Sequence, residues 1–322
     1  MVIGGGTGSF TVLSALKHVT SHLTALVTMA DDGGSTGKLR DELGVLPPGD
    51  VRQCLVALSD SPKIRDLFTY RFEEGTLAGH SFGNLLLTAL EKLTGSFAEA
   101  VETASEILNV TGKVVPITLD NVRLILKAGD GFEIHGEHRI DTLRFGESAR
   151  RPELCLEPDA TLNPDARAAI IQADLVVIAP GDIYTSLGPL LIVEGVGQAL
   201  ADCKARVAYV CNLVVKPGQT TGFSVADHAD EIERFAGAPI LDYVLYNTAE
   251  PDQELLSRYT RDEEFLVSVP ADHFRHAHYK AIGRPLISPV GDTMKQHDVL
   301  ASHRSLIRHD TYALTQAIIK LL

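Results

Sequence analysis

The opening residues have the composition of a phosphate-binding turn. A glycine-rich stretch separates a short apolar start from an apolar-periodic segment over residues 10–18. A strand, a glycine turn and a helix N-terminus form an anion cradle, because glycine permits close backbone approach and free N–H groups favour phosphate. The spacing lacks the third glycine of the dinucleotide fingerprint and the Gly-Lys-Ser/Thr of a P-loop. The pattern favours nucleotide or phosphate binding over a structural turn. The cradle comprises Gly4, Gly5, Gly6, Thr7 and Gly8.

Two carboxylates follow the next apolar run. Asp31 and Asp32 come directly after residues 23–29, and Gly33 and Ser35 belong to the Gly-Gly-Ser-Thr-Gly stretch behind them. Carboxylates at a strand end beside the first glycine turn can accept hydrogen bonds from a ribose or hold magnesium. The glycines and hydroxyls would form a second amide-rich loop. The alternative is a solvated turn capped by Asp and Ser.

Two helix starts carry side chains that suit either capping or ligand binding. Asp50 follows Pro-Pro-Gly, which forces a turn, and we expect it to N-cap a helix over residues 51–58 or to face a ligand. Ser81 is expected to cap the helix over residues 84–93. The first residue of that helix, Asn84, directs its amide toward a site or toward a backbone partner.

Donor groups also follow the apolar run over residues 175–179. Pro-Gly comes first, then three hydroxyl-bearing residues at the start of a new helix. Such a turn places donors where an anionic ligand would lie. The residues concerned are Gly181, Tyr184, Thr185 and Ser186.

Two further polar residues complete the set. Asn212 follows the apolar run over residues 206–211 and repeats the strand-end arrangement. Arg308 precedes the last helix, over residues 310–321. In an acidic protein this arginine is either a diphosphate clamp or half of a surface ion pair.

Apolar runs of strand length alternate with segments of helical periodicity, and this alternation indicates a sheet that can bring these groups together. It predicts a Rossmann-like, doubly wound α/β fold with a mostly parallel sheet and helices on both faces. We expect one domain over residues 1–322, with β-hairpins inserted over residues 122–158. The expected strands are 23–29, 114–118, 175–179, 206–211, 243–247 and 265–269. The expected helices are 10–18, 51–58, 84–93, 97–108, 165–172, 225–235 and 310–321.

Composition narrows the classes of function. Apolar residues make up 45% of the 322 residues and the formal net charge is −13, which fits a folded protein and argues against nucleic-acid binding. No apolar stretch reaches the length of a membrane span, so we expect a cytoplasmic protein. The four cysteines lie far apart and form no Cys-x-x-Cys motif, so we expect reduced thiols and neither disulfides nor a zinc site. Only three residues precede the glycines, so we expect the natural start to lie slightly upstream.

Six motifs taken together resemble the bacterial gluconeogenesis factor (YvcK-like) family. They lie in the same order as in that family, and the resemblance extends to residues 308–311. Asp182 stands where serine is commoner, and residues 213–220 also depart from the usual pattern, which leaves the exact ligand open. The motifs are residues 4–8, 30–37, 47–52, 80–84, 180–186 and 211–212.

The resemblance implies a cytoplasmic protein that binds UDP-sugars such as UDP-N-acetylglucosamine. It also implies a role in cell shape and peptidoglycan synthesis during growth on gluconeogenic carbon sources, with protein partners in cell-wall synthesis. A homo-oligomer is compatible with this resemblance. The same superfamily contains the 2-phospho-L-lactate transferases (CofD-like), which are enzymes.

Two main hypotheses follow. In the first, a non-catalytic regulator requires no cofactor and binds a nucleotide-sugar. Residues 4–8, Thr185 and Ser186 contact phosphates, Asp31 or Asp32 contacts the ribose or magnesium, and Asn84, Asn212 and Arg308 contact the remainder. In the second, a transferase uses Asp50 or Asp32 to hold magnesium, and Asp50 is its catalytic residue. NAD binding is a third, less favoured alternative.

Overall fold

The computed structural model describes residues 1–129, 131–145, 151–261, 263–269, 274–288 and 307–322. A seven-stranded sheet forms its centre, in the order β10-β9-β8-β7-β1-β2-β3, and neighbouring strands are parallel throughout. The predicted Rossmann-like, doubly wound fold is confirmed. The strands are β1 (Val2–Ile3), β2 (Thr24–Val27), β3 (Lys113–Pro116), β7 (Leu175–Ile178), β8 (Arg206–Val210), β9 (Tyr243–Asn247) and β10 (Lys280–Arg284).

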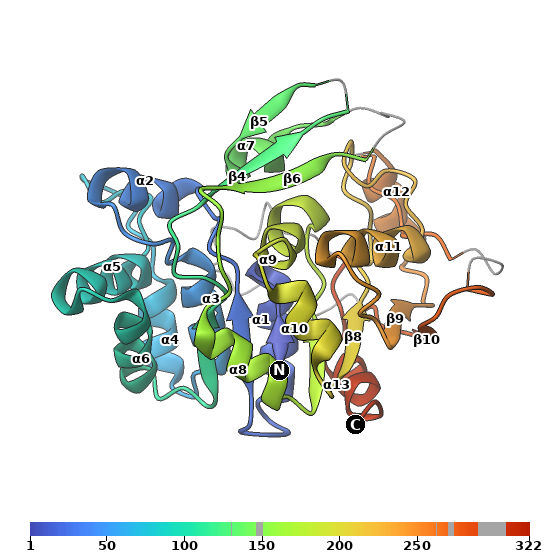
Figure 1. The fold of residues 1–322 in the computed structure, drawn as a ribbon, viewed down its shortest axis with the longest axis horizontal. Helices are drawn as coiled ribbons and strands as arrows, with labels where there is room; N and C mark the ends of the chain where they lie inside the picture. The colour runs from blue at the N-terminus through green and yellow to red at the C-terminus, as the bar shows by residue number, and fades with distance from the viewer. Residues whose placement is uncertain (130, 146–150, 262, 270–273, 289–306) are drawn as a thin grey trace.

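Helices cover both faces of this sheet, which is why the central strands are almost continuously apolar. All four residues of β7 are buried. On one face α1 packs against α3 and α13, and on the other α10 packs against α8 and α11 (Figure 1). The helices are α1 (Gly6–Leu16), α2 (Gly34–Leu43), α3 (Gly49–Leu58), α4 (Pro62–Thr69), α5 (Phe82–Thr94), α6 (Phe97–Ile107), α8 (Pro164–Gln172), the π-helical turn η1 (Ile183–Leu187), α9 (Gly188–Leu191), α10 (Val196–Asp202), α11 (Val225–Ala236), α12 (Gln253–Arg261) and α13 (Thr311–Ile319).

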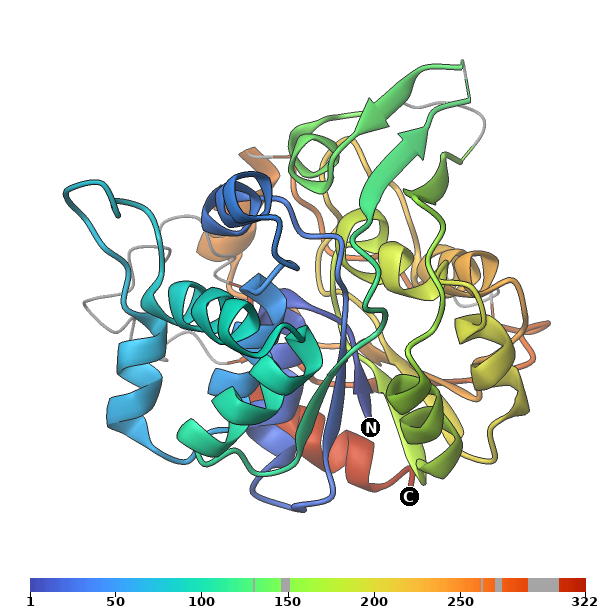
Figure 2. The ribbon, with the colours of Figure 1, turned by 60° about the vertical axis from the view of Figure 1, so that its left-hand side comes forward.

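A second sheet stands over the carboxyl ends of the parallel strands. It is antiparallel, in the order β5-β4-β6, and both views show it on the side opposite the chain termini (Figures 1 and 2). We call this sheet and its helix the cap. It occupies the predicted insertion, of which residues 130 and 146–150 lie outside the described part. Its elements are β4 (Arg123–Lys127), β5 (Glu133–His135), α7 (Glu137–Thr142) and β6 (Glu153–Glu157).

One predicted strand is wrong. Within residues 265–269 only Leu266 and Ser268 make isolated bridges, to Val214 and Ser224. The edge strand is instead β10, whose sequence is less apolar because an edge is less buried than the centre of a sheet. Apolar content alone therefore selected the wrong one of two neighbouring segments.

Two other local predictions change. Gly34 to Gly37, expected as a loop, form the first turn of α2. Asp50 is not an N-cap, because α3 begins at Gly49, two residues before the predicted start, and Pro48 takes the cap position. Among the described residues, no helix combines the length and the apolar character needed to cross a membrane.

Candidate functional site

The order of strands reverses at β1 and β7, and the glycine cradle lies at that switch point. β1 pairs with β2 on one side and with β7 on the other, and ligands of such sheets bind outside the carboxyl ends of the strands at the reversal. The loops after β1 and β7 touch there. A Cβ on Gly8 would lie 1.7 Å from the Pro180 carbonyl oxygen, so only glycine fits. We call residues 4–8 and 180–182 the switch loops.

A carboxylate already occupies part of the cradle. The N–H of Gly6, in the first turn of α1, donates to Asp50 Oδ1 at 2.9 Å, and a Cβ on Gly5 would lie 2.3 Å from Asp50 Oδ2. Burial and the nearby Asp31 raise the pKa of Asp50 to about 7, against the opposing effects of the Gly6 N–H and Arg52. Near neutral pH this carboxyl is therefore protonated in part of the molecules. The proton reduces the repulsion that a phosphate would otherwise meet.

The two aspartates after β2 have different surroundings. Asp31 Oδ1 accepts from Gly33 N at 2.9 Å, and burial is the main cause that raises the pKa of this carboxyl. Asp32 points to the cap, where its two oxygens accept from His138 N at 2.8 Å and Glu137 N at 3.2 Å. Asp32 therefore holds the N-terminus of α7, whereas Asp31 lies with Asp50 beside the cradle.

Ser35 and Asn84 form a buried polar cluster that joins α2 to α5. Ser35 Oγ lies 3.0 Å from His80 Nδ1, and Asn84 Nδ2 donates to Ser35 Oγ at 3.3 Å. Asn84 Oδ1 accepts from Arg52 Nε at 2.9 Å. The predicted Ser81 cap is confirmed, because its hydroxyl accepts from Asn84 N. Asn84 and Ser35 are 3% and 6% exposed, so they position α2 and α5 and do not face solvent.

The hydroxyl-bearing side chains after β7 differ in burial. Tyr184 is buried and its hydroxyl donates to Glu231 Oε1 at 2.9 Å. Thr185 is buried and donates to Asp141 Oδ1 of the cap at 3.3 Å. Ser186 and Gly181 are partly exposed. Of this predicted group, Ser186 and Gly181 are therefore the residues a ligand can reach without rearrangement.

Asn212 fixes the second switch loop. Its Oδ1 accepts from Gly181 N at 3.1 Å, and its Nδ2 donates to Gly181 O at 2.9 Å. This pair of bonds ties the end of β8 to the turn after β7. Asn212 thus positions Gly181.

Arg308 and Thr7 lie at exposed positions. The carbonyl of Arg308 accepts from Ser288 N at 2.8 Å. The imidazole of the next residue, His309, hydrogen-bonds the backbone of Cys211. The segment that carries Arg308 therefore lies against the end of β8, on the same edge as Asn212.

The cap contributes a carboxyl that the motifs did not single out. Burial, followed by the charges of Asp31, Asp141, Asp50 and Asp32, raises the pKa of Glu137 to about 9. The charges of the two aspartates beside the cradle thus act on the carboxyl of Glu137, and its pKa lies above neutral pH. The sequence shows Gly136 before an acidic residue, which can signal a helix start, but the surrounding glycines favoured a hairpin.

A lysine links the cap to the second switch loop. Lys216, from the loop after β8, donates to Asp182 Oδ2 at 2.7 Å and also pairs with Asp141 of α7. Burial opposes the charged ammonium, but Asp182 and Asp141 outweigh it and raise the pKa of Lys216. Gln219 adds three bonds from its Nε2 to the carbonyls of Ile140, Asp141 and Leu143. The cap is therefore held at both ends of α7.

Magnesium fits Asp31 and Asp50 better than Asp32. Both oxygens of Asp32 accept from amides of α7, whereas Asp31 and Asp50 lie together beside the cradle, where the charge of Asp31 raises the pKa of Asp50. Within the described ranges, no group of three or more His, Cys, Asp or Glu residues is arranged to hold a metal. Two carboxylates suit magnesium when phosphate oxygens complete its coordination. Such an ion would thus bind together with a diphosphate.

Comparison with known families gives a match over most of the sequence. The profile of the family described as 2-phospho-L-lactate transferase CofD matches residues 1–287. A Bacillus subtilis protein named gluconeogenesis factor is 37% identical, over 100% of this chain and 97% of its own length. A Thermoanaerobacterium thermosulfurigenes protein provisionally given the same name is 42% identical, over 100% of this chain and 96% of its own.

A solved structure has the same fold. The crystal structure of a Bacillus halodurans protein, described as a member of the UPF0052 family, superposes with a TM-score of 0.87. It is 35% identical in sequence, and the alignment covers 99% of this chain and 98% of that one. The similarity thus extends to the whole arrangement of elements.

Proposed function

The chain belongs to the gluconeogenesis factor family, within the wider CofD family, and on that premise we propose that it is a regulatory protein that binds a nucleotide-sugar. We propose a UDP-sugar such as UDP-N-acetylglucosamine as the ligand. We further propose that the protein acts in the cytoplasm, with partners in cell-wall synthesis, and supports cell shape and peptidoglycan synthesis on gluconeogenic carbon sources.

The observation that carries this proposal is the contact between the two switch loops. Gly8 lies so close to the Pro180 carbonyl that no side chain fits between them. The N-terminus of α1 and the turn before η1 therefore meet at one point of the sheet edge. Helix N-termini favour anions, so a diphosphate here would lie at the N-terminus of α1 and beside the second switch loop.

The raised pKa values of the four cysteine thiols favour a regulator over an enzyme with a thiolate nucleophile. Burial raises the pKa of the Cys54 thiol, and burial raises that of Cys211 to about 12. Neither thiol is ionised at neutral pH, and a protonated thiol is a weak nucleophile. Binding a nucleotide-sugar needs oriented donors only, which the switch loops supply.

A transferase is the second candidate, and the Asp31 and Asp50 pair is the observation that favours it. Magnesium, when bound, would neutralise charge on a transferring phosphoryl group. Asp31 and Asp50 would hold the ion, and Asp50 would also orient an acceptor hydroxyl. The match to the CofD profile over residues 1–287 is compatible with this chemistry.

Calorimetric titration with UDP-N-acetylglucosamine, UDP-glucose, GDP and NAD, each with and without magnesium, separates the two. The regulator predicts micromolar UDP-sugar binding and no product after hours of incubation. Asp50→Asn removes a negative charge that repels phosphate at the cradle, so the regulator predicts equal or tighter binding at pH 8 without magnesium. Magnesium-dependent turnover that disappears in Asp50→Asn would replace the regulator with the transferase.

A further inference from the structure

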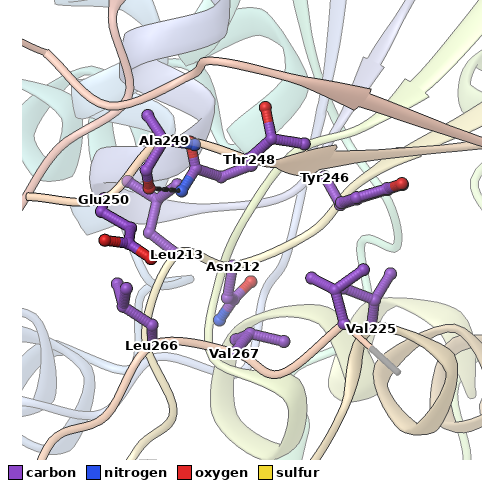
Figure 3. A pocket seen from close by; sticks show the side chains of 11 residues that line it. Asn212, Leu213, Val225, Tyr246, Thr248, Ala249, Glu250, Leu266 and Val267 are labelled. Carbon is purple, nitrogen blue, oxygen red and sulfur yellow. Dashed lines mark hydrogen bonds between the residues drawn. The ribbon is translucent and has the colours of Figure 1, made fainter. Parts of the chain in front are cut away.

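A cavity of about 330 Å³ opens beside the carboxyl ends of β8 and β9 (Figure 3). Its volume is at the lower end of the range of small-molecule sites, about 300 to 1,000 Å³. The walls come from four places in the chain: the loop after β8, the end of β9, the start of α11 and residues 266–269. The loops of several strands thus converge on one space at the same edge of the sheet as the switch loops.

The chemistry of the walls does not suit a phosphate. Leu213, Val225, Leu266 and Val267 are apolar, and Glu250 is the one charged residue among the described residues that line the cavity. A carboxylate and aliphatic side chains repel or fail to solvate an anion. The same walls can bury a flat neutral ring.

An aromatic side chain forms one edge of the cavity. Tyr246 lines it and stacks on Phe274, with ring centroids 5.5 Å apart and planes 26° from parallel. Gly283 of β10 makes room for this ring, because a Cβ there would lie 2.9 Å from Tyr246 Cζ. The ring is therefore fixed from two sides, and a fixed aromatic edge suits a planar ligand.

Asn212 connects the cavity to the second switch loop. It lines the cavity and also makes two hydrogen bonds to Gly181. β9 lies two strands from β7, which is about 10 Å at the usual strand spacing. An extended nucleoside diphosphate can bridge that distance.

We propose that this cavity holds the heterocyclic base of the nucleotide whose diphosphate lies at the switch loops. The inference rests on the proposed function and adds an orientation to it. The base lies toward β9 and the phosphates toward β1. The sugar attached to the diphosphate then lies under the cap, on the side of α7.

Methyl NMR of the whole chain tests the location directly. UDP should shift the methyl resonances of Leu213, Val225 and Val267 and give contacts from uracil H5 and H6 to them. Inorganic pyrophosphate should leave those resonances in place. UDP binding with these methyls unmoved would overturn the base site while the proposed function stands. No binding of UDP or UDP-sugars by the wild type would overturn both.

A pair of variants gives an independent test. Val267→Trp fills the cavity and should weaken UDP binding by about tenfold or more, since the base loses most of its buried contact. Pyrophosphate affinity should stay within about twofold, which also shows that the variant is folded. Phe265→Trp adds an indole two residues away at a side chain that is 46% exposed and outside the cavity lining; it should change neither affinity. Equal UDP binding by both variants would contradict the base site.

Discussion

Glu137 is an acid whose environment disfavours its charge. Its pKa rises from an ordinary value near 4.5 to about 9, chiefly through burial and then through Asp31 and the other carboxylates beside it. The folded protein therefore binds more protons than the unfolded chain between these two pH values. Stability should fall as pH rises through this window.

The Glu137→Gln variant should lose the part of the pH dependence of stability that the Glu137 carboxyl causes. We expect the wild-type Tm to fall between pH 5 and pH 9 without ligand, and the variant to lose part of that fall. At pH 9 the variant should melt about 2 °C or more above the wild type. Differential scanning calorimetry across this range measures the effect. Glu133→Gln, at an exposed position on β5, is the control, and an equal change in both variants would show that Glu137 has no special environment.

Gly8 and Gly181 are matched glycines on the two switch loops. A Cβ on Gly8 would lie 1.7 Å from a backbone oxygen, whereas a Cβ on Gly181 would meet its nearest atoms at 3.4 Å. Gly8→Ala should therefore separate the loops, lower stability by about 2 to 4 kcal/mol and abolish UDP-sugar binding. Gly181→Ala should change stability by less than about 1 kcal/mol. Urea unfolding and calorimetry measure both, and equal effects would mean that the loops do not need this contact.

At the scale of elements, α7 depends on polar contacts at its two ends. Asp32 accepts from its first amides, and Gln219 donates to three carbonyls at its other end. Both partners belong to the parallel-sheet part of the chain. This short helix is thus one attachment of the cap, and β6 also packs against α9.

Gln219→Ala should loosen the cap without unfolding the sheet. We expect amide exchange over residues 133–142 to accelerate by about tenfold, which corresponds to about 1.4 kcal/mol. Exchange in β7 and β8 should stay unchanged. Hydrogen-exchange mass spectrometry resolves the two regions, with Gln198→Ala on the exposed side of α10 as the control. Acceleration across the whole sheet would show that the cap and the sheet unfold together.

The sequence predicted most elements whose apolar pattern is strong, and it failed where polar or glycine-rich segments fold through partners. The buried strands β7, β8 and β9 were found because both faces are covered. Helix α2 was missed because its first turn contains two glycines, and its position depends on Asn84 and Arg40, which bond to distant residues. Single-sequence patterns carry no information on such partners.

The same limit applies to the candidate site. The motifs indicated the glycine turn, Asp31, Asp50 and Gly181, which lie at or beside the switch point. They could not show that Asp32 and Tyr184 bond within the protein, to α7 and Glu231. They also gave no reason to select Glu137, which reaches the site from an insertion about 100 residues away in sequence.

For the whole molecule, the central claim is that a nucleotide-sugar binds where the parallel sheet reverses its strand order and the cap stands above. Ligand binding at that point should hold the cap, the first switch loop and the second switch loop together. The claim therefore concerns three segments that are far apart in the sequence.

Hydrogen-exchange mass spectrometry of the wild-type chain, with and without saturating UDP-N-acetylglucosamine, tests this most directly. We predict slower exchange over residues 4–10, 137–142 and 180–187, and unchanged exchange in α4 and α6. No change anywhere, or protection confined to regions away from the carboxyl edge of the sheet, would contradict the account.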